Sequence, residues 1–412
     1  MRFVSILGIF VLFAIAWIFS KHKRKINYRT VIVGTLLQFI FALIVLKTTP
    51  GRMFFEFMND VIIKLLAFSD EGARFLFGSL INNDSLGFIF AFQVLPTIIF
   101  FSSLMSVLYY LGIMQKIVVF FARIMAKFMG LSGAESLSAS ANIFVGQTEA
   151  PLVVKPYVAD MTQSELLAVM TGGMATIAGG VMAAYVGILK DYLPNIAGHL
   201  LAASIMSAPA ALVMSKMMLP EIEKPKTMGI VKMHLEIKDA NVIDAAANGA
   251  TLGMKLALNV GACLIAFMSL LALMNYITGL FGGLFNYPSL TLEKILSWLF
   301  TPLAWIMGVP GSEVSQVANW MGQKTFLNEF VAYFNMANFL KDNPGVLSER
   351  TITIASYALC GFSNFLSIAI QIGGIGGIAP NRRSDLAKLG LYAVLAGSLA
   401  CFMTATLAGI LL

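Results

Sequence analysis

The stretch LSGAESLSASANIFVGQTEAPLVVKPYVADM, residues 131–161, decides the fold class, because its polarity fits neither a membrane span nor a loop. Polar residues such as Glu135, Gln147 and Glu149 interrupt a largely apolar run. Irregular backbone at membrane depth is tolerated only where protein or a water-filled cavity surrounds it. We therefore expect a re-entrant hairpin that turns back near residues 145–149.

The sequence on both sides of this stretch is typical of a polytopic membrane protein. The chain has 412 residues, of which 58% are hydrophobic and 12% are charged, whereas soluble domains carry about 25% charged residues. Apolar runs near spanning length, about 20 residues, recur along the chain. They predict an all-α protein with about eight transmembrane helices, at residues 3–20, 30–48, 87–112, 163–189, 197–218, 245–280, 351–374 and 386–411.

A second polar, interrupted stretch at residues 302–334 predicts a second re-entrant hairpin. Each hairpin precedes an interrupted span, with TGGMATIAGGV at 171–181 after the first and CGFSNFLS at 360–367 after the second. With the basic loops placed inside, the two hairpins enter the membrane from opposite sides. This pattern is typical of an inverted-repeat transporter whose site lies where broken helices meet.

Basic residues gather in alternate connections, which is the positive-inside pattern of cytoplasmic loops. Five follow the first apolar run within residues 21–29, and others lie within 216–238 and 382–388. The net charge of +7 therefore indicates topology and not a surface for nucleic acid. The pattern predicts a bacterial cytoplasmic (inner) membrane protein with both termini outside. Amphipathic stretches predict interfacial helices at residues 53–68, 118–130 and 292–300.

Two glutamates, Glu149 and Glu329, lie in the predicted hairpins, where one charge at mid-membrane costs about 2.5–3.5 kcal/mol on insertion scales. Such a glutamate accepts hydrogen bonds from a ligand, pairs with a lysine such as Lys155 or Lys324, or caps a helix end. Neutral groups nearby suit an uncharged polar ligand such as a sugar ring or a base edge, although single ones also join helices. These are Asn142, Gln147, Thr148, Asn328, Asn364 and Ser367.

A coupling ion requires oxygen ligands, which the first hairpin and the break in the next span offer. Asn142 and Thr176 have side-chain oxygens, and Val145 and Ile177 have backbone carbonyls. Carbonyls of unwound helices coordinate sodium in inverted-repeat transporters, so this neutral set favours sodium. A proton requires a titrating group, and Glu149 is then the candidate.

Other functional classes have less support. The three histidines and three cysteines are scattered and show no metal-ligand or nucleophile spacing, so we expect no enzyme and no cofactor. A passive channel requires continuous polar faces along the pore, whereas two broken hairpins favour alternating access.

Three motifs strongly resemble the concentrative nucleoside transporter family, in its sodium-coupled bacterial branch: GQTEAPLVVKPY at 146–157, LNEF at 327–330 and CGFSNFLSIAIQIGGIGGIAPNRRSDLAKLG at 360–390. The resemblance covers nearly the whole chain. It implies a homotrimer of eight-span subunits in which a transport domain moves as an elevator against a scaffold. The implied division is mainly scaffold at 1–112 and 220–290, and mainly transport domain at 113–219 and 291–412.

The resemblance also implies roles for single residues, carried over by matching positions. The nucleobase is expected to contact Gln147, Thr148, Glu149 and Val181 in the first hairpin and the span after it. The ribose is expected to contact Glu329, Asn364 and Ser367, with Phe362 beside the nucleoside. Sodium is expected among Asn142, Val145, Thr176 and Ile177. The implied function is sodium-coupled import of nucleosides such as uridine; the alternative is proton-coupled import with Glu149 titrating.

Overall fold

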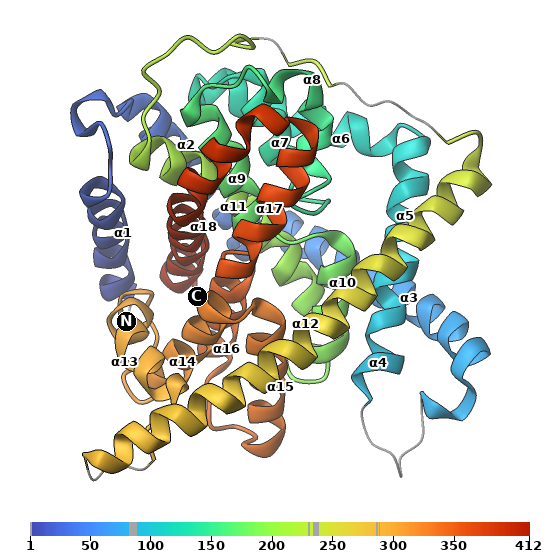
Figure 1. Cartoon of the computed structure of the whole chain (residues 1–412), viewed down its shortest axis with the longest axis vertical. Coiled ribbons are helices and arrows are strands. Elements are labelled where there is room, and N and C mark those ends of the chain that lie inside the picture. Colours follow the sequence, from blue (N-terminus) through green and yellow to red (C-terminus); the bar gives the residue numbers. More distant parts are fainter. Residues whose placement is uncertain (1, 82–88, 230, 234–238, 286, 288) are drawn as a thin grey trace.

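The structure, a computed structural model, describes residues 2–81, 89–229, 231–233, 239–285, 287 and 289–412 (Figure 1). The chain is helical, and no strand occurs within these ranges. Six helices there are long and apolar enough to cross a membrane, and two shorter apolar helices bring the number to the eight expected. The all-α prediction is therefore confirmed.

The spans follow the predicted runs closely, and two of them are broken in the middle; the first two residues of the predicted span 87–112 lie outside the described residues. The spans are α1 (Arg2–Ile18), α2 (Tyr28–Lys47), α5 (Leu95–Tyr110), α9 with α10 (Gln163–Ala175 and Gly179–Leu189), α11 (Ile196–Met218), α12 (Val242–Leu284), α16 with α17 (Glu349–Leu359 and Phe365–Ile378) and α18 (Arg383–Leu411). Short helices connect them: η1 (Lys23–Lys25), η2 (Gly78–Leu80), α4 (Phe90–Gln93) and η4 (Pro380–Arg382).

Two helical hairpins precede the broken spans. The first descends through α7 (Gly133–Ala141) and returns through η3 (Ala150–Val154) and α8 (Lys155–Val158), so its turn includes the predicted residues 145–149. The second consists of α14 (Val314–Phe326) and α15 (Glu329–Asp342).

The predicted start of the second hairpin at residue 302 is wrong. Pro302 lies inside α13 (Leu292–Ile306), a separate helix with one buried face. The chain turns after α13, where Gly308 has a φ of 93° that favours glycine. The hairpin accordingly begins at Val314.

Three amphipathic helices confirm the predicted interfacial segments. They are α3 (Thr49–Phe77), α6 (Ile113–Met129) and α13. The first is much longer than the predicted 53–68, because Thr48 caps its N-terminus and it ends only at Gly78, whose φ is 58°.

Packing divides the molecule around two groups of helices (Figure 1). The almost wholly buried α11 lies against α2, α9 and α18. The longest helix, α12, instead crosses the molecule obliquely and pairs with α5. Small residues permit this close approach: a Cβ added at Gly253 would lie 2.7 Å from Cα of Ile99.

The basic segments gather at one end of the molecule, where Figure 1 shows the α1–α2 connection, the α17–α18 turn and the described part of the α11–α12 connection. A buried ion pair lies in the last turn of α11 near this end. Lys216 Nζ lies 2.7 Å from Glu135 Oε2 and 3.4 Å from Glu221 Oε2, and it donates a 2.9 Å hydrogen bond to Ser164 Oγ. This network joins α7, α9 and α11.

Candidate functional site

The two broken spans meet at their interruptions. The amide of Phe362, in the second break, donates to the carbonyl of Thr176, in the first, over 3.4 Å. Gly361 permits this contact, because its φ is 152° and a Cβ there would lie 2.9 Å from the carbonyl oxygen of Met174. The breaks therefore place four helix ends, from α9, α10, α16 and α17, close together.

Glu329 is the acidic centre of this region and is 4% exposed. It begins α15, directly after the N-cap Asn328, whose Oδ1 accepts a hydrogen bond from the Val331 amide. A carboxylate is stabilised in the first turn of a helix by the helix dipole. This placement explains how a carboxylate is retained in the apolar interior.

Two side chains from other elements donate to the Glu329 carboxylate. Tyr185 Oη on α10 donates to Oε1 over 3.0 Å, and Asn364 Nδ2 donates to Oε2 over 2.8 Å. A carboxylate has about four acceptor positions, so both oxygens keep capacity for further donors, such as the hydroxyl groups of a sugar.

The tip of the first hairpin is bonded to α17. Gln147 Nε2 donates to Ser367 Oγ over 3.1 Å, and Gln371 Nε2 donates to Gln147 Oε1 over 3.0 Å. The Ser367 amide in turn donates to Asn364 Oδ1 over 2.9 Å. Gln147, Ser367, Asn364 and Glu329 therefore form one continuous buried chain of hydrogen bonds between the two hairpins.

The other residues predicted at the site lie around this chain. Thr148 packs against Gly374 on α17. A Cβ added at Gly374 would lie 2.6 Å from Cγ2 of Thr148. Val181 is buried one helical turn before Tyr185, and Phe362 is half-buried in the second break. Glu149 is exposed, and its carboxylate lies over Gly146, so a side chain at that position would displace it.

The residues predicted to hold sodium lie where the first hairpin meets the first break. The Gly179 amide donates to the Phe144 carbonyl over 3.0 Å and so joins the hairpin turn to α10. Asn142 is fully buried, and its Oδ1 has no hydrogen-bond partner among the described residues. Thr176 Oγ1 donates to the Gly172 carbonyl over 2.9 Å and keeps its lone pairs. An orphaned buried amide oxygen, together with a hydroxyl oxygen that still has lone pairs to offer, is the kind of donor set that a small, hard cation takes.

A buried lysine from the second hairpin lies against the second break. Lys324 is fully buried on α14, and its Nζ donates to the Ala358 carbonyl in the last turn of α16 over 2.8 Å. A lysine at a helix C-terminus interacts favourably with the helix dipole and the last carbonyls. Lys324 therefore caps the broken helix, and within the described ranges no ion pair joins Glu149 or Glu329 to a lysine.

Two residues of the buried chain were not predicted, namely Tyr185 and Gln371. Each lies one helical turn beyond a predicted residue on the same helix, Val181 and Ser367 respectively. Spacing of four residues places side chains on one helix face, so this spacing is the signal that sequence reasoning could have used. Gln371 also donates to the Met170 carbonyl over 2.9 Å, which ties α17 to α9.

Models of three segments of one transporter family match this chain. They are described as "Na+ dependent nucleoside transporter N-terminus" at residues 7–80, "Nucleoside recognition" at 91–192 and "Na+ dependent nucleoside transporter C-terminus" at 199–409. Together they cover both hairpins, both broken spans and most of the buried helix α11.

Relatives of known sequence are similar over nearly the whole chain. An uncharacterized transporter of Haemophilus influenzae is 48% identical over 409 residues, which are 98% of this chain and 97% of that protein. Mouse sodium/nucleoside cotransporter 1 is 41% identical over 422 residues, covering 100% of this chain and 64% of that longer protein. These relatives are transporters and not enzymes, and the same holds for this chain.

The solved structures of CNTnw have the same fold. The structure of CNTnw in an inward-facing substrate-bound state matches this chain with a TM-score of 0.93 and 46% sequence identity. The match covers 100% of this chain and 98% of that chain. A CNTnw variant in an outward-facing state gives 46% identity and a TM-score of 0.94, over 99% and 98% of the two chains. The fold is thus that of an inverted-repeat, elevator-type transporter, and the chain belongs to the concentrative nucleoside transporter family.

Proposed function

We propose that this protein is a sodium-coupled symporter that imports nucleosides such as uridine. The observation that carries the proposal is the buried chain from Gln147 through Ser367 and Asn364 to Glu329, which links both hairpins and the second broken helix. Its groups are neutral amides and a hydroxyl with one carboxylate, and they match the hydroxyls and amides of an uncharged nucleoside.

The nucleoside lies between the hairpins in this proposal. Glu329, Asn364 and Ser367 bind the ribose hydroxyls, because the carboxylate accepts and Asn364 can both donate and accept. The base lies against Gln147, Thr148, Glu149 and Val181, with Phe362 beside it. Gln147 now donates to Ser367, so an entering nucleoside has to replace that bond with bonds of its own.

Sodium occupies the oxygens of Asn142 and Thr176 together with the carbonyls of Val145 and Ile177. The partnerless Oδ1 of Asn142 supports this assignment. The ion holds the first hairpin against the break between α9 and α10, where the Gly179–Phe144 hydrogen bond already joins them. Sodium binding therefore organises Gln147 and Thr148 for the base.

Coupling follows from the cost of leaving the site empty. The Glu329 carboxylate keeps unused acceptor positions when no nucleoside is bound, and leaving a buried acceptor unsatisfied costs about 1–3 kcal/mol, so a transport domain with only sodium bound is held back from crossing. Bound nucleoside satisfies those groups. One sodium ion moving down about 100 mV supplies roughly 2.3 kcal/mol before its concentration gradient is counted, which is enough to accumulate an uncharged solute tens-fold.

The moving parts are proposed from the family resemblance and the packing. Residues 1–112 and 220–290 form mainly the scaffold, and residues 113–219 and 291–412 form mainly the transport domain. The close pairing of α5 with α12 supports a separate scaffold element. We further propose a homotrimer in a bacterial inner membrane, with the basic end in the cytoplasm and both termini outside.

The testing experiment is uptake of radiolabelled uridine into proteoliposomes under an imposed sodium gradient or an imposed proton gradient. Accumulation driven by sodium alone is the expected result. Accumulation driven by protons alone would keep the nucleoside site and transfer coupling to Glu149. No uptake under either gradient would contradict the proposed substrate class.

A further inference from the structure

The amphipathic helix α6 presents an unusual outer face. Its inner face is apolar and buried through residues spaced three or four apart: Met114, Val118, Ala122, Met125 and Met129. The outer face carries three exposed cations, Lys116, Arg123 and Lys127, together with exposed Phe120 and Phe128. No acidic residue occurs in the helix.

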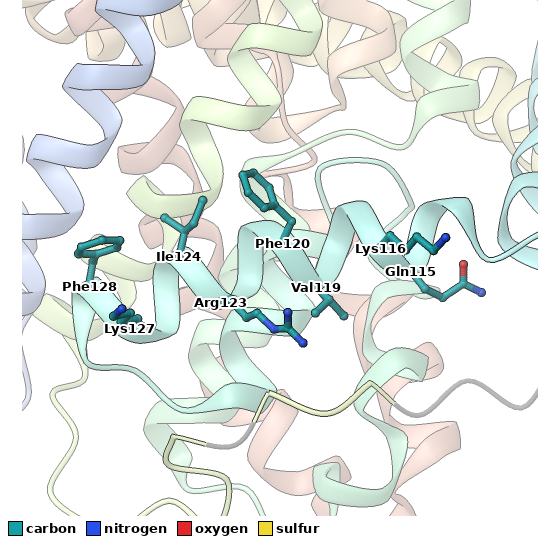
Figure 2. A pocket seen from close by; sticks show the side chains of 8 residues that line it. All are labelled: Gln115, Lys116, Val119, Phe120, Arg123, Ile124, Lys127 and Phe128. Carbon is teal, nitrogen blue, oxygen red and sulfur yellow. The ribbon is translucent and has the colours of Figure 1, made fainter.

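The outer face borders an open hollow of about 760 Å³, which Figure 2 shows at close range. Phe120, Ile124 and Phe128 project along one edge of the helix, whereas Arg123 lies on the other side of the outer face (Figure 2). The surface is therefore divided along its length into an apolar edge and a basic edge.

The three cations are uncompensated within the described part of the chain, where no ion pair, hydrogen bond or ring contact involves their side chains. Arg123 and Lys127 are four residues apart, so they lie next to each other on the helix. Like charges at this spacing destabilise a helix. A bound anion between them would remove that repulsion.

We propose that α6 binds the headgroup of an anionic phospholipid, with the phosphate held by Arg123 and Lys127, Lys116 adding positive charge two turns earlier on the same face, and the acyl chains lying on Phe120, Ile124 and Phe128. Charge complementarity and the adjacent apolar edge favour a lipid, because a free phosphate would use only the basic half of the surface. Basic amphipathic helices bind anionic membrane surfaces by both contributions together.

The position of α6 connects this lipid to transport. The helix follows α5 and packs against α7, the first helix of the hairpin that carries Asn142 and Gln147. A lipid held on α6 therefore lies beside the connection between the α5–α12 pair and that hairpin. We expect the rate of uptake to rise with the fraction of anionic lipid.

The test compares two variants with equal loss of charge. In the first, Lys116, Arg123 and Lys127 of α6 are replaced by Gln. In the matched control, three exposed basic residues are replaced by Gln, namely Arg24 and Lys25 of the α1–α2 connection and Arg29 in the first turn of α2. The connection lies at the same end of the molecule (Figure 1). Phosphatidylglycerol that remains bound after detergent washing is counted by native mass spectrometry, which does not depend on transport activity.

The expected result is that the α6 variant loses one retained phosphatidylglycerol per subunit, whereas the control keeps it. In liposomes of phosphatidylcholine with increasing phosphatidylglycerol, uptake should rise for the unmodified protein and the control and stay flat for the α6 variant. Equal retention by the α6 variant and the unmodified protein would overturn the proposal. So would equal loss in both variants, displacement by millimolar inorganic phosphate alone, or dissociation of the oligomer in the α6 variant, which would indicate a second copy on this face.

Discussion

At the scale of single residues, Glu329 shows how a carboxyl group is positioned in an apolar interior with acceptor capacity left for a ligand. Its two donors, Tyr185 and Asn364, come from different helices, and its position in the first turn of α15 adds the favourable helix dipole. Neither donor is a cation. The carboxylate is therefore held in place without an ion pair that would compete with a ligand for it.

Replacing Glu329 by Gln should weaken uridine binding by about ten- to a hundredfold, because hydrogen bonds to a charged group contribute about 1.5–3 kcal/mol. Calorimetry on the purified protein measures the affinity, and gel filtration checks that the oligomer is intact. Glu313→Gln, at the base of the same hairpin, is the control. Unchanged uridine affinity in Glu329→Gln would contradict the ribose role.

A substitution at Thr176 tests ion binding separately from nucleoside binding. In Thr176→Ala, the sodium concentration for half-maximal uptake should rise about tenfold, since one ligand oxygen is lost from a buried site. Uridine affinity at saturating sodium should change less than twofold. Uptake measured against sodium concentration tests this, with Thr353→Ala on α16 as the control. A loss of uridine affinity with unaltered sodium dependence would show that the residue acts on the nucleoside.

At the scale of elements, two buried lysines stabilise helix ends in different ways. Lys216 pairs with Glu135 and joins α7, α9 and α11 at the basic end. Lys324 instead donates to the last turn of α16. The first break has no such lysine, and Asn142 Oδ1 in the neighbouring hairpin turn has no partner among the described residues. The second break is thus stabilised by the ammonium group of Lys324. In our proposal, sodium takes the corresponding role at the first break.

Breaking the Lys216–Glu135 pair should destabilise the protein strongly. Lys216→Met leaves a buried carboxylate uncompensated, which costs about 3–5 kcal/mol, so the midpoint of thermal unfolding in detergent should fall by several degrees. The matched control is Lys226→Met. It removes the exposed partner of Asp160, and exposed pairs contribute about 0–1 kcal/mol. Equal midpoints for the two variants would show that the buried pair contributes nothing.

At the scale of the whole molecule, the proposed movement requires α10 to slide along α5. The two helices are in close contact, since a Cβ at Gly180 would lie 3.6 Å from Ser102 Oγ. Cysteines at the two positions would therefore have their side chains in contact, as a disulfide requires. In Gly180→Cys with Ser102→Cys, oxidation should abolish uptake and a reductant should restore it.

A control for this cross-link lies within the α5–α12 pair. Ser103 Oγ donates to the Ala246 carbonyl over 2.8 Å, and both residues belong to the proposed scaffold. Oxidation of Ser103→Cys with Ala246→Cys should leave uridine uptake unchanged. If uptake also persists when the α5–α10 pair is fully cross-linked, as mass spectrometry of the peptides would verify, these helices do not move against each other.

Apolar runs were enough to predict the spans, and the polar residues and glycines that interrupt them were enough to predict the first hairpin turn and the two breaks, because burial in a membrane depends on the composition of each segment. Prediction was weaker where local sequence permits two outcomes. Pro302 was expected to begin the second hairpin but lies inside α13, and α3 extends beyond its apolar core because its caps define its ends.

The sequence by itself thus determined the class of protein, the number of spans and the residues that resemble the family motifs. Only the tertiary structure decided that Gln147 meets Ser367 across 220 positions of sequence and that Tyr185 meets Glu329 across 144. It also decided that Lys324 donates to α16 and not to Glu329. The physical reason is that a buried polar group takes whichever partner helix packing brings within about 3 Å, and that packing is set by the whole chain.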